Sequence, residues 1–418
     1  MSQVESVLPN HCMPSAAPRP ERWLRAAMIG WIVLATAASI KNVIEPEFHT
    51  VYTTFSHAAR DWWAGNSLYV GREFFYSPSF AVLMTPFAIW PDWLGGVFWT
   101  WASCGALFYS LRVFYREVLP AMSWPHRAEG QFLLLVLIGT VRSVWSCQSN
   151  ALLVAMVLLA AVEMVRGRWW RGALWLAVPI HIKVWPVVVG GLFAAQSPRR
   201  LAARLALCVA GFGMIPFLTQ SPATVVGQYT GWYHCLADRQ TGGGRYPGYR
   251  DAWTIWEQVH RPVDARSYLA LQLAAGLAIL GWCVWQRRRG LPLRQLAIYT
   301  IAAWSVWQLL FGPGTERLTY NLIAPALAWG VLTCAYSGRQ RIWITTAYLT
   351  TFILGVGGVE RFLMRWCPAT TALEPVGVLI FATWLVWHAA RTNPWPSERL
   401  EQAPLTETPH SIRHGRAA

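Results

Sequence analysis

The chain has 418 residues, of which 55% are hydrophobic and only 13% are charged. A soluble domain usually carries about 25% charged residues, so this composition excludes a soluble globule, a disordered chain, collagen and a small disulfide scaffold. The mean hydropathy is +0.31, and the apolar residues fall in long runs. These features predict an all-α protein that crosses a membrane many times.

The apolar runs predict a single membrane domain at residues 23–390 with about twelve helices, since one span needs about 20 apolar residues. Two of the runs are too short for a full span and flank Pro179 and Pro186, which predicts a broken hairpin inside the membrane. In chain order, the predicted helices lie near 24–43, 94–114, 130–146, 150–165, 172–181, 184–197, 201–218, 267–286, 294–311, 318–335, 342–357 and 373–390.

The net charge of +15 comes from arginines that cluster between alternate predicted helices. Such clusters are typical of cytoplasmic loops, so we attribute the basic excess to membrane topology and expect no nucleic-acid partner. The pattern predicts a plasma-membrane protein whose tails, 1–22 and 391–418, both lie in the cytoplasm. Two long loops, at about 44–93 and 219–266, then lie on the external face.

An acidic segment follows the first predicted helix directly, with the sequence Ile44-Glu-Pro-Glu-Phe-His-Thr-Val-Tyr52. Transfer of a sugar with inversion needs a carboxylate that takes the proton of the acceptor hydroxyl. Glu47 or Glu45 can be this base, and His49 can be a second base or a donor to phosphate. The alternative is that these carboxylates are only solvated at the membrane surface.

Lys183 lies beside His181 between the two short helices. A charge at membrane depth costs about 3 kcal/mol on insertion scales, so such a residue is a candidate for function. Its natural partner is an anionic phosphate. The alternative is that the lysine side chain extends to the external interface and needs no ligand.

Two further polar pairs lie at predicted external helix ends. Gln148 and Asn150 can hydrogen-bond a sugar or a phosphate, or they can simply cap a helix. Glu316 and Arg317 can face substrate, or they can form an ordinary surface ion pair.

The eight cysteines are scattered singly, and no Cys-x-x-Cys occurs. This spacing indicates neither a zinc site nor a disulfide framework.

Several short motifs follow one another in an order that resembles glycosyltransferase family 87, the polyprenyl-phosphate-mannose-dependent α-mannosyltransferase type. The resemblance covers roughly residues 20–335. The motifs are Ala58-Ala-Arg-Asp-Trp-Trp-Ala-Gly-Asn-Ser-Leu-Tyr69, Phe75-Tyr-Ser-Pro78, Gln148-Ser-Asn150, Arg166-Gly-Arg168, Lys183-Val-Trp-Pro186 and Arg199-Arg200.

The resemblance implies a GT-C fold with its active site on the external face. It also implies a polyprenyl-phosphate sugar as donor and a glycan or glycolipid as acceptor. On the same basis we expect no nucleotide sugar, no required metal and no cofactor. The family's base is an aspartate in the first external loop, but counting back from Ala58-Ala59 and Gly65 puts Val51 at that position. Glu47 and Glu45 match only if the loop carries a few extra residues.

Gln148, Asn150 and Lys183 transfer more directly from the resemblance, whereas the segment with Glu316 and Arg317 matches the family poorly. The full set of substrate-binding candidates is Lys183, His181, Gln148, Asn150, Tyr76, Glu316 and Arg317. Our interpretation is a membrane hexosyltransferase that uses a lipid-linked sugar. Two alternatives stay open: a transporter or flippase with Lys183 and His181 in its pathway, and an inactive relative whose Glu45 and Glu47 point away from any cavity.

Overall fold

The computed structural model describes residues 21–71, 73–119, 125–241, 248–259, 264–335, 337–354, 357–392 and 394. Most of the two predicted tails, 1–22 and 391–418, lies outside these described residues. Regular structure in the described part consists of helices, without a β-strand. The predicted all-α class is therefore confirmed, and helices long and apolar enough to cross a membrane are present.

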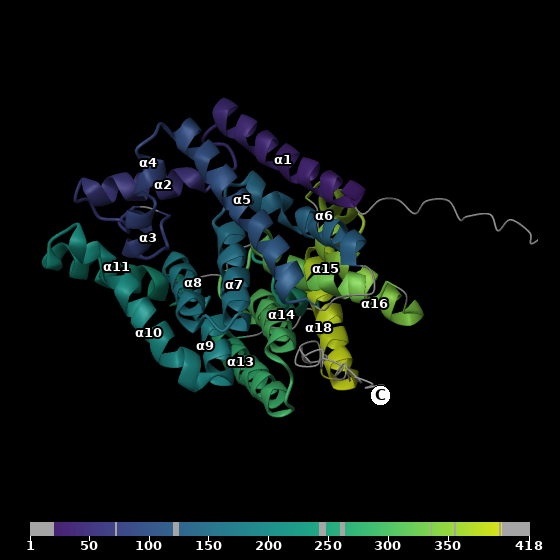
Figure 1. The fold of residues 1–418 in the computed structure, drawn as a ribbon. Helices are drawn as coiled ribbons and strands as arrows, with labels where there is room; N and C mark the ends of the chain where they lie inside the picture. The colour runs from purple at the N-terminus through teal and green to yellow at the C-terminus, as the bar shows by residue number, and fades with distance from the viewer. Residues whose placement is uncertain are drawn as a thin grey trace, which may run out of the picture.

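Each helix predicted from an apolar run has a counterpart (Figure 1). In the first half of the chain the helices are α1 Glu21–Ile44, α2 Tyr52–Trp63, α3 Pro78–Leu83, α4 Thr85–Ala88, α5 Asp92–Glu117, α6 Pro125–Trp145, α7 Asn150–Val165, α8 Trp169–Ile182, α9 Val187–Gln196, α10 Pro198–Met214 and the short η1 Ile215–Leu218.

The second half of the chain continues as a series of helices of very unequal length. They are α11 Pro222–Thr241, α12 Ala252–Gln258, α13 Ala265–Arg288, α14 Leu293–Phe311, η2 Arg317–Ile323, α15 Ala324–Thr333, α16 Gly338–Leu349, η3 Thr350–Leu354, α17 Gly357–Met364, η4 Pro368–Ala372 and α18 Leu373–Arg391.

Five helical segments in the described residues meet the length and apolarity of a membrane span. The other helices at predicted span positions are shorter or less apolar, as α7, α9 and α15 illustrate. The five segments are Glu21–Ile44, Ala128–Trp145, Pro198–Leu218, Ala265–Arg288 and Ala369–Arg391.

The predicted external loops are largely helical. Helices α2, α3 and α4 occupy the first loop, and α11 and α12 occupy much of the second. In α2 the buried residues Tyr52, Phe55, Ala59 and Trp62 recur at helical spacing, so one face of the helix is apolar. Our interpretation of these segments as loops missed this spacing.

Helix α7 lies in the middle of the bundle, with α5, α8 and α14 packed around it (Figure 1). It is almost uniformly apolar, as expected of a helix that is buried on all sides. A second apolar cluster joins α2 and α3 to the ends of α7 and α8, through Phe55, Phe80, Leu153 and Ile182. The start of α7 therefore lies where the main bundle meets the smaller helices.

The predicted break between two short helices is present. Helix α8 ends at Ile182, Lys183 is extended with φ −136° and ψ 144°, and α9 begins at Val187. Because this backbone leaves the helical path, the Lys183 side chain projects from a helix end rather than from a helix side.

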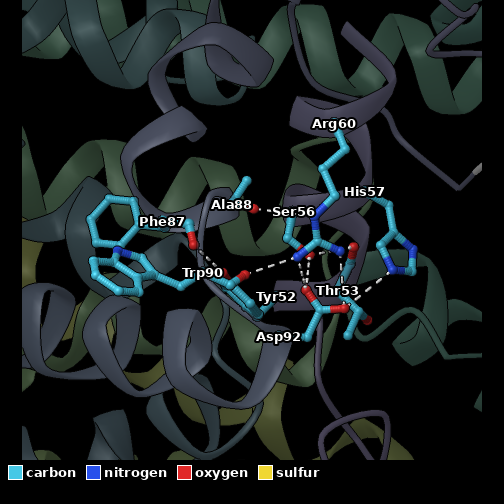
Figure 2. Close-up of polar contacts among 9 residues, drawn as sticks. All are labelled: Tyr52, Thr53, Ser56, His57, Arg60, Phe87, Ala88, Trp90 and Asp92. Carbon is cyan, nitrogen blue, oxygen red and sulfur yellow. Dashed lines mark hydrogen bonds and ion pairs between the residues drawn. The ribbon is translucent and has the colours of Figure 1, made fainter. Parts of the chain in front are cut away.

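An ion pair fixes α2 against the beginning of α5 (Figure 2). The Arg60 guanidinium donates to both oxygens of Asp92, at 2.7 and 3.2 Å, and Ser56 Oγ donates to Asp92 Oδ1 at 2.8 Å. His57 Nε2 lies 3.4 Å from Asp92 Oδ2. Burial opposes ionisation, but the hydrogen bonds from Arg60 and Ser56 and the Arg60 charge outweigh it, so the pKa of Asp92 lies below its ordinary value.

Candidate functional site

Four of the predicted substrate-binding residues lie together where α7 and α8 meet the smaller helices; we call them the Lys183 group. Lys183 Nζ donates to Asn150 Oδ1 at 2.7 Å, and Tyr76 Oη donates to Gln148 Oε1 at 3.3 Å. The ammonium also lies 5.8 Å from the centre of the Tyr76 ring, a cation–π distance. Tyr76, Gln148 and Asn150 are buried, and Lys183 is half-buried.

The Asn150 side chain connects two separate parts of the chain. Its Nδ2 donates to the carbonyl of Leu318 at 2.8 Å, while its Oδ1 receives Lys183. Ser149 is the N-cap of α7, and its side chain makes no capping hydrogen bond. Asn150 therefore links α8 to η2 rather than capping α7.

Arg317, which precedes Leu318, takes part in a second group that we call the Glu374 cluster: Glu374, Arg142 and Arg317. Arg142 Nη1 lies 2.6 Å from Glu374 Oε1, and Arg317 Nε lies 3.7 Å from Glu374 Oε2. The Glu374 side chain is only 3% exposed. Three elements far apart in the sequence, α6, η2 and α18, therefore meet at one buried carboxylate.

The segment before α12 packs against the same place. The Arg250 backbone N–H donates to the Thr315 carbonyl at 2.8 Å, and Tyr320 Oη donates to the Arg250 carbonyl at 2.8 Å. Glu316 forms an isolated bridge with Tyr249. Thus Glu316 pairs with Tyr249 through its backbone, whereas the Arg317 side chain contacts the Glu374 carboxylate.

Sequence reasoning missed Arg142 and Glu374 as site residues. Both lie inside predicted helices, at 130–146 and 373–390, and each is a charge within an otherwise apolar run. Such charges are rare in membrane helices and usually pair with one another. This signal would have found both residues, although it would not have shown that they meet.

His181 projects away from the Lys183 group toward α10. Its Nε2 lies 2.8 Å from the carbonyl of Val209, and its ring lies beside Phe212. Ser77 Oγ donates to the backbone carbonyl of His181. The structure thus assigns His181 contacts that hold α3 and α10 against the end of α8.

Glu45, Glu47 and His49 are exposed, unlike Tyr76, Gln148 and Asn150. Glu45 and Glu47 border a shallow, open depression together with Pro46 and Phe48. Another hollow of about 260 Å³ between α2 and residues 68–74 contains Asp61, Glu73 and His57 among its lining residues.

Lys41 fixes the backbone of the acidic loop. Its Nζ donates to the carbonyls of Phe48, His49 and Trp145, at 3.2, 3.4 and 2.9 Å. Residues His49 and Cys147 both have left-handed backbones, with φ of 46° and 50°. Strained backbones of this kind persist where the surroundings determine them, and they cluster at functional sites.

A second link ties the acidic loop to the Lys183 group. The Val51 N–H donates to the Ser146 carbonyl at 3.0 Å, two residues before Gln148. The loop with Glu45 and Glu47 therefore lies against the turn that carries Gln148. In the part of the chain that the structure describes, no three His, Cys, Asp or Glu side chains lie close enough together to hold a metal ion.

Comparison with known proteins gives one family. A search of curated proteins finds no match to the chain. The sequence model of glycosyltransferase family 87 matches residues 74–313, more than half of the chain. The matched residues include Tyr76, Arg142, Gln148, Asn150 and Lys183. The chain therefore belongs to glycosyltransferase family 87 and is a membrane glycosyltransferase.

Proposed function

We propose that the protein is a hexosyltransferase that moves mannose, or a related sugar, from a polyprenyl-phosphate donor to an acceptor hydroxyl on the external face of the plasma membrane. The acceptor is a glycan or a glycolipid. The observation that carries the proposal is that three cations lie on elements in contact with one another. Lys183 is linked to η2 through Asn150 and Leu318, and Arg317 of η2 shares Glu374 with Arg142 of α6.

These cations suit the phosphate of a lipid-linked sugar. As the bond from the sugar to the phosphate breaks, negative charge grows on the phosphate oxygens that leave. A cation already fixed at that position lowers the barrier, because it does not need to reorganise during the reaction. Lys183 provides a point charge, whereas the planar guanidinium of an arginine can donate two parallel hydrogen bonds to phosphate.

The neutral members of the Lys183 group suit the sugar. Gln148, Asn150 and the Tyr76 hydroxyl can donate or accept hydrogen bonds from sugar hydroxyls, and the Tyr76 ring offers an apolar face. Since these side chains are buried and already hydrogen-bonded to one another or to Lys183, they are held in place before substrate arrives.

The reaction needs a base for the acceptor, and we propose Glu47, with Glu45 as the alternative and His49 beside them. The acceptor oxygen attacks C1 of the donor sugar, the bond from C1 to the phosphate oxygen breaks, and the acceptor proton passes to the carboxylate. Attack on a β-linked donor from the opposite face gives an α-glycoside. The contact between Val51 and Ser146 supports a base on this loop, because it places the loop against the Gln148 turn.

Membership of a glycosyltransferase family favours this function over the transporter or flippase. The proposed orientation, with both ends of the chain in the cytoplasm, rests on the arginine-rich segments, which are typical of cytoplasmic loops.

A transfer assay identifies the base. Purified full-length protein in lipid receives radiolabelled polyprenyl-phosphate-mannose and a membrane extract as acceptor, beside Glu47→Gln and Glu45→Gln. We expect transfer by the wild type and its loss in Glu47→Gln only. Transfer that survives Glu47→Gln but not Glu45→Gln moves the base to Glu45. If both variants keep full transfer, neither glutamate is the base.

A further inference from the structure

Glu374 lies at the first turn of α18, beyond the residues that match the family. Its carboxylate is nearly inaccessible to solvent, and each of its oxygens faces a different arginine. A buried carboxylate is stable only if cations or hydrogen bonds compensate it, and here Arg142 and Arg317 provide that compensation. The same contacts hold the two guanidinium groups in place, because Arg142 faces Oε1 of Glu374 and Arg317 faces Oε2.

The Glu374 cluster is connected to the Lys183 group by a short chain of contacts. Arg317 is followed by Leu318, whose carbonyl accepts from Asn150, and Asn150 accepts from Lys183. Arg142 lies in the last turn of α6, just before the turn that carries Gln148. Movement of either arginine would therefore shift an element that carries a substrate-binding candidate.

A similar cluster exists elsewhere in the protein and provides a natural control. Glu129 on α6 receives Arg112 Nε at 2.8 Å and Arg116 Nη2 at 3.1 Å. These residues lie near the start of α6 and the end of α5, at the opposite end of α6 from Arg142. The two clusters thus share their chemistry, one carboxylate between two arginines, but not their position.

We propose that Glu374 is a positioning residue that holds Arg142 and Arg317 ready for the phosphate of the lipid donor. The inference rests on the proposed function, because it takes the donor phosphate as the anion. Without the carboxylate, two guanidinium groups that now share a partner would repel each other and turn toward water. The phosphate would then lose two preorganised cations.

Binding of a short-chain polyprenyl phosphate, the product that leaves the reaction, tests the proposal directly. The full-length protein in lipid nanodiscs is titrated with this compound, and transfer kinetics are measured in parallel. We expect Glu374→Gln to weaken binding by at least about tenfold, since hydrogen bonds between charged groups are the strong ones. We expect Glu374→Asp to recover much of the affinity and Glu129→Gln to bind as the wild type does.

The kinetics separate positioning from a general structural defect. Glu374→Gln should raise the KM for the lipid-phosphate donor and leave the KM for the acceptor unchanged. A loss of folding would lower the active fraction and leave both KM values unchanged. If Glu374→Gln does not fold, Glu374→Asp and Arg317→Lys test the proposal in its place. Both should bind polyprenyl phosphate more weakly than the wild type, the former only slightly, while Glu129→Gln should bind it as the wild type does.

Three results would overturn parts of the account. If the wild type binds polyprenyl phosphate and Glu374→Gln binds it equally well, Glu374 does not position the arginines. If Arg317→Lys and Glu374→Asp both bind as the wild type does, the inference also fails. If the wild type neither binds polyprenyl phosphate nor transfers sugar from such a donor, the proposed function itself is wrong.

Discussion

Lys41 and Lys183 are the only lysines in the chain, and each connects separate segments. Lys183 joins the end of α8 to the start of α7 through Asn150, and Lys41 joins the acidic loop to the end of α6 through backbone carbonyls. A lysine suits both places because its ammonium can donate several hydrogen bonds in different directions. Arginines make up the rest of the Lys and Arg count, and several of them cluster near helix ends, as Arg287 and Arg288 do at the end of α13.

Replacing Lys41 with methionine keeps an unbranched apolar chain of similar length but removes the ammonium group. The hydrogen bonds to the carbonyls of Phe48, His49 and Trp145 are then lost. We expect a loss of about 1–3 kcal/mol in stability, because a hydrogen bond from a charged group contributes on this scale. Transfer activity should also fall, since the loop that carries Glu45 and Glu47 loses its anchor. Thermal unfolding and sugar transfer measure the two effects, and wild-type values for both in Lys41→Met would contradict the role.

The pair of Asp92 and Arg60 predicts a dependence of stability on pH. The pKa of Asp92 is lower in the folded protein than in the unfolded chain, so its contribution is fully present above the unfolded value of about 3.9. The contribution is lost as the pH falls through the folded pKa. Thermal unfolding between pH 7 and about pH 3 should therefore show a smaller loss of stability for Asp92→Asn than for the wild type. Parallel curves would show that the pair does not contribute.

At the scale of the elements, α6 connects several parts of the candidate site. Helix α6 packs against η2 and α15, and in its last turn Arg142 contacts Glu374. The helix ends at Trp145, whose carbonyl accepts a hydrogen bond from Lys41. Gly139 allows this close packing, because a Cβ there would lie 2.8 Å from both Ala324 Cβ and Phe352 Cζ.

Gly139→Ala should therefore push α6 away from α15 and η3. We expect a loss of about 1–3 kcal/mol in stability, as in other overpacked cores, and reduced transfer, because Arg142 follows less than one turn later. Gly105→Ala on α5 is the matched control, since its Cβ would meet nothing within 4 Å. That variant should unfold at the wild-type temperature or slightly above it. If the two alanine variants unfold alike, close packing at Gly139 does not matter.

The helices themselves could be predicted because long apolar runs identify them. Their packing could not, and this explains what the sequence analysis missed. Arg142, Arg317 and Glu374 lie far apart in the sequence, so only the packing of α6, η2 and α18 shows that they meet. A local pattern would have predicted α2, because Tyr52 and Phe55 begin a series of apolar residues at helical spacing in the sequence.

At the scale of the whole molecule, the candidate site lies where two parts of the chain meet. The region that matches the family contains Tyr76, Gln148, Asn150 and Lys183, all of which sequence reasoning selected, and the structure brings them together. The region after residue 313 adds Arg317 and Glu374. The role of Glu47 or Glu45 stays a prediction, because both lie on an exposed loop. Backbone contacts through Lys41 and Val51 relate this loop to the end of α6 and the Gln148 turn.

The central claim is that Lys183 binds the phosphate of a lipid-linked sugar donor, and the transfer rate of Lys183→Met tests it most directly. Full-length protein in lipid is given polyprenyl-phosphate-mannose, and kcat/KM is compared with that of the wild type. We predict a fall of about 10²–10³-fold, as when one preorganised donor is removed from an active site, with Lys183→Arg recovering part of the rate. Transfer by a folded Lys183→Met at the wild-type rate would contradict the claim.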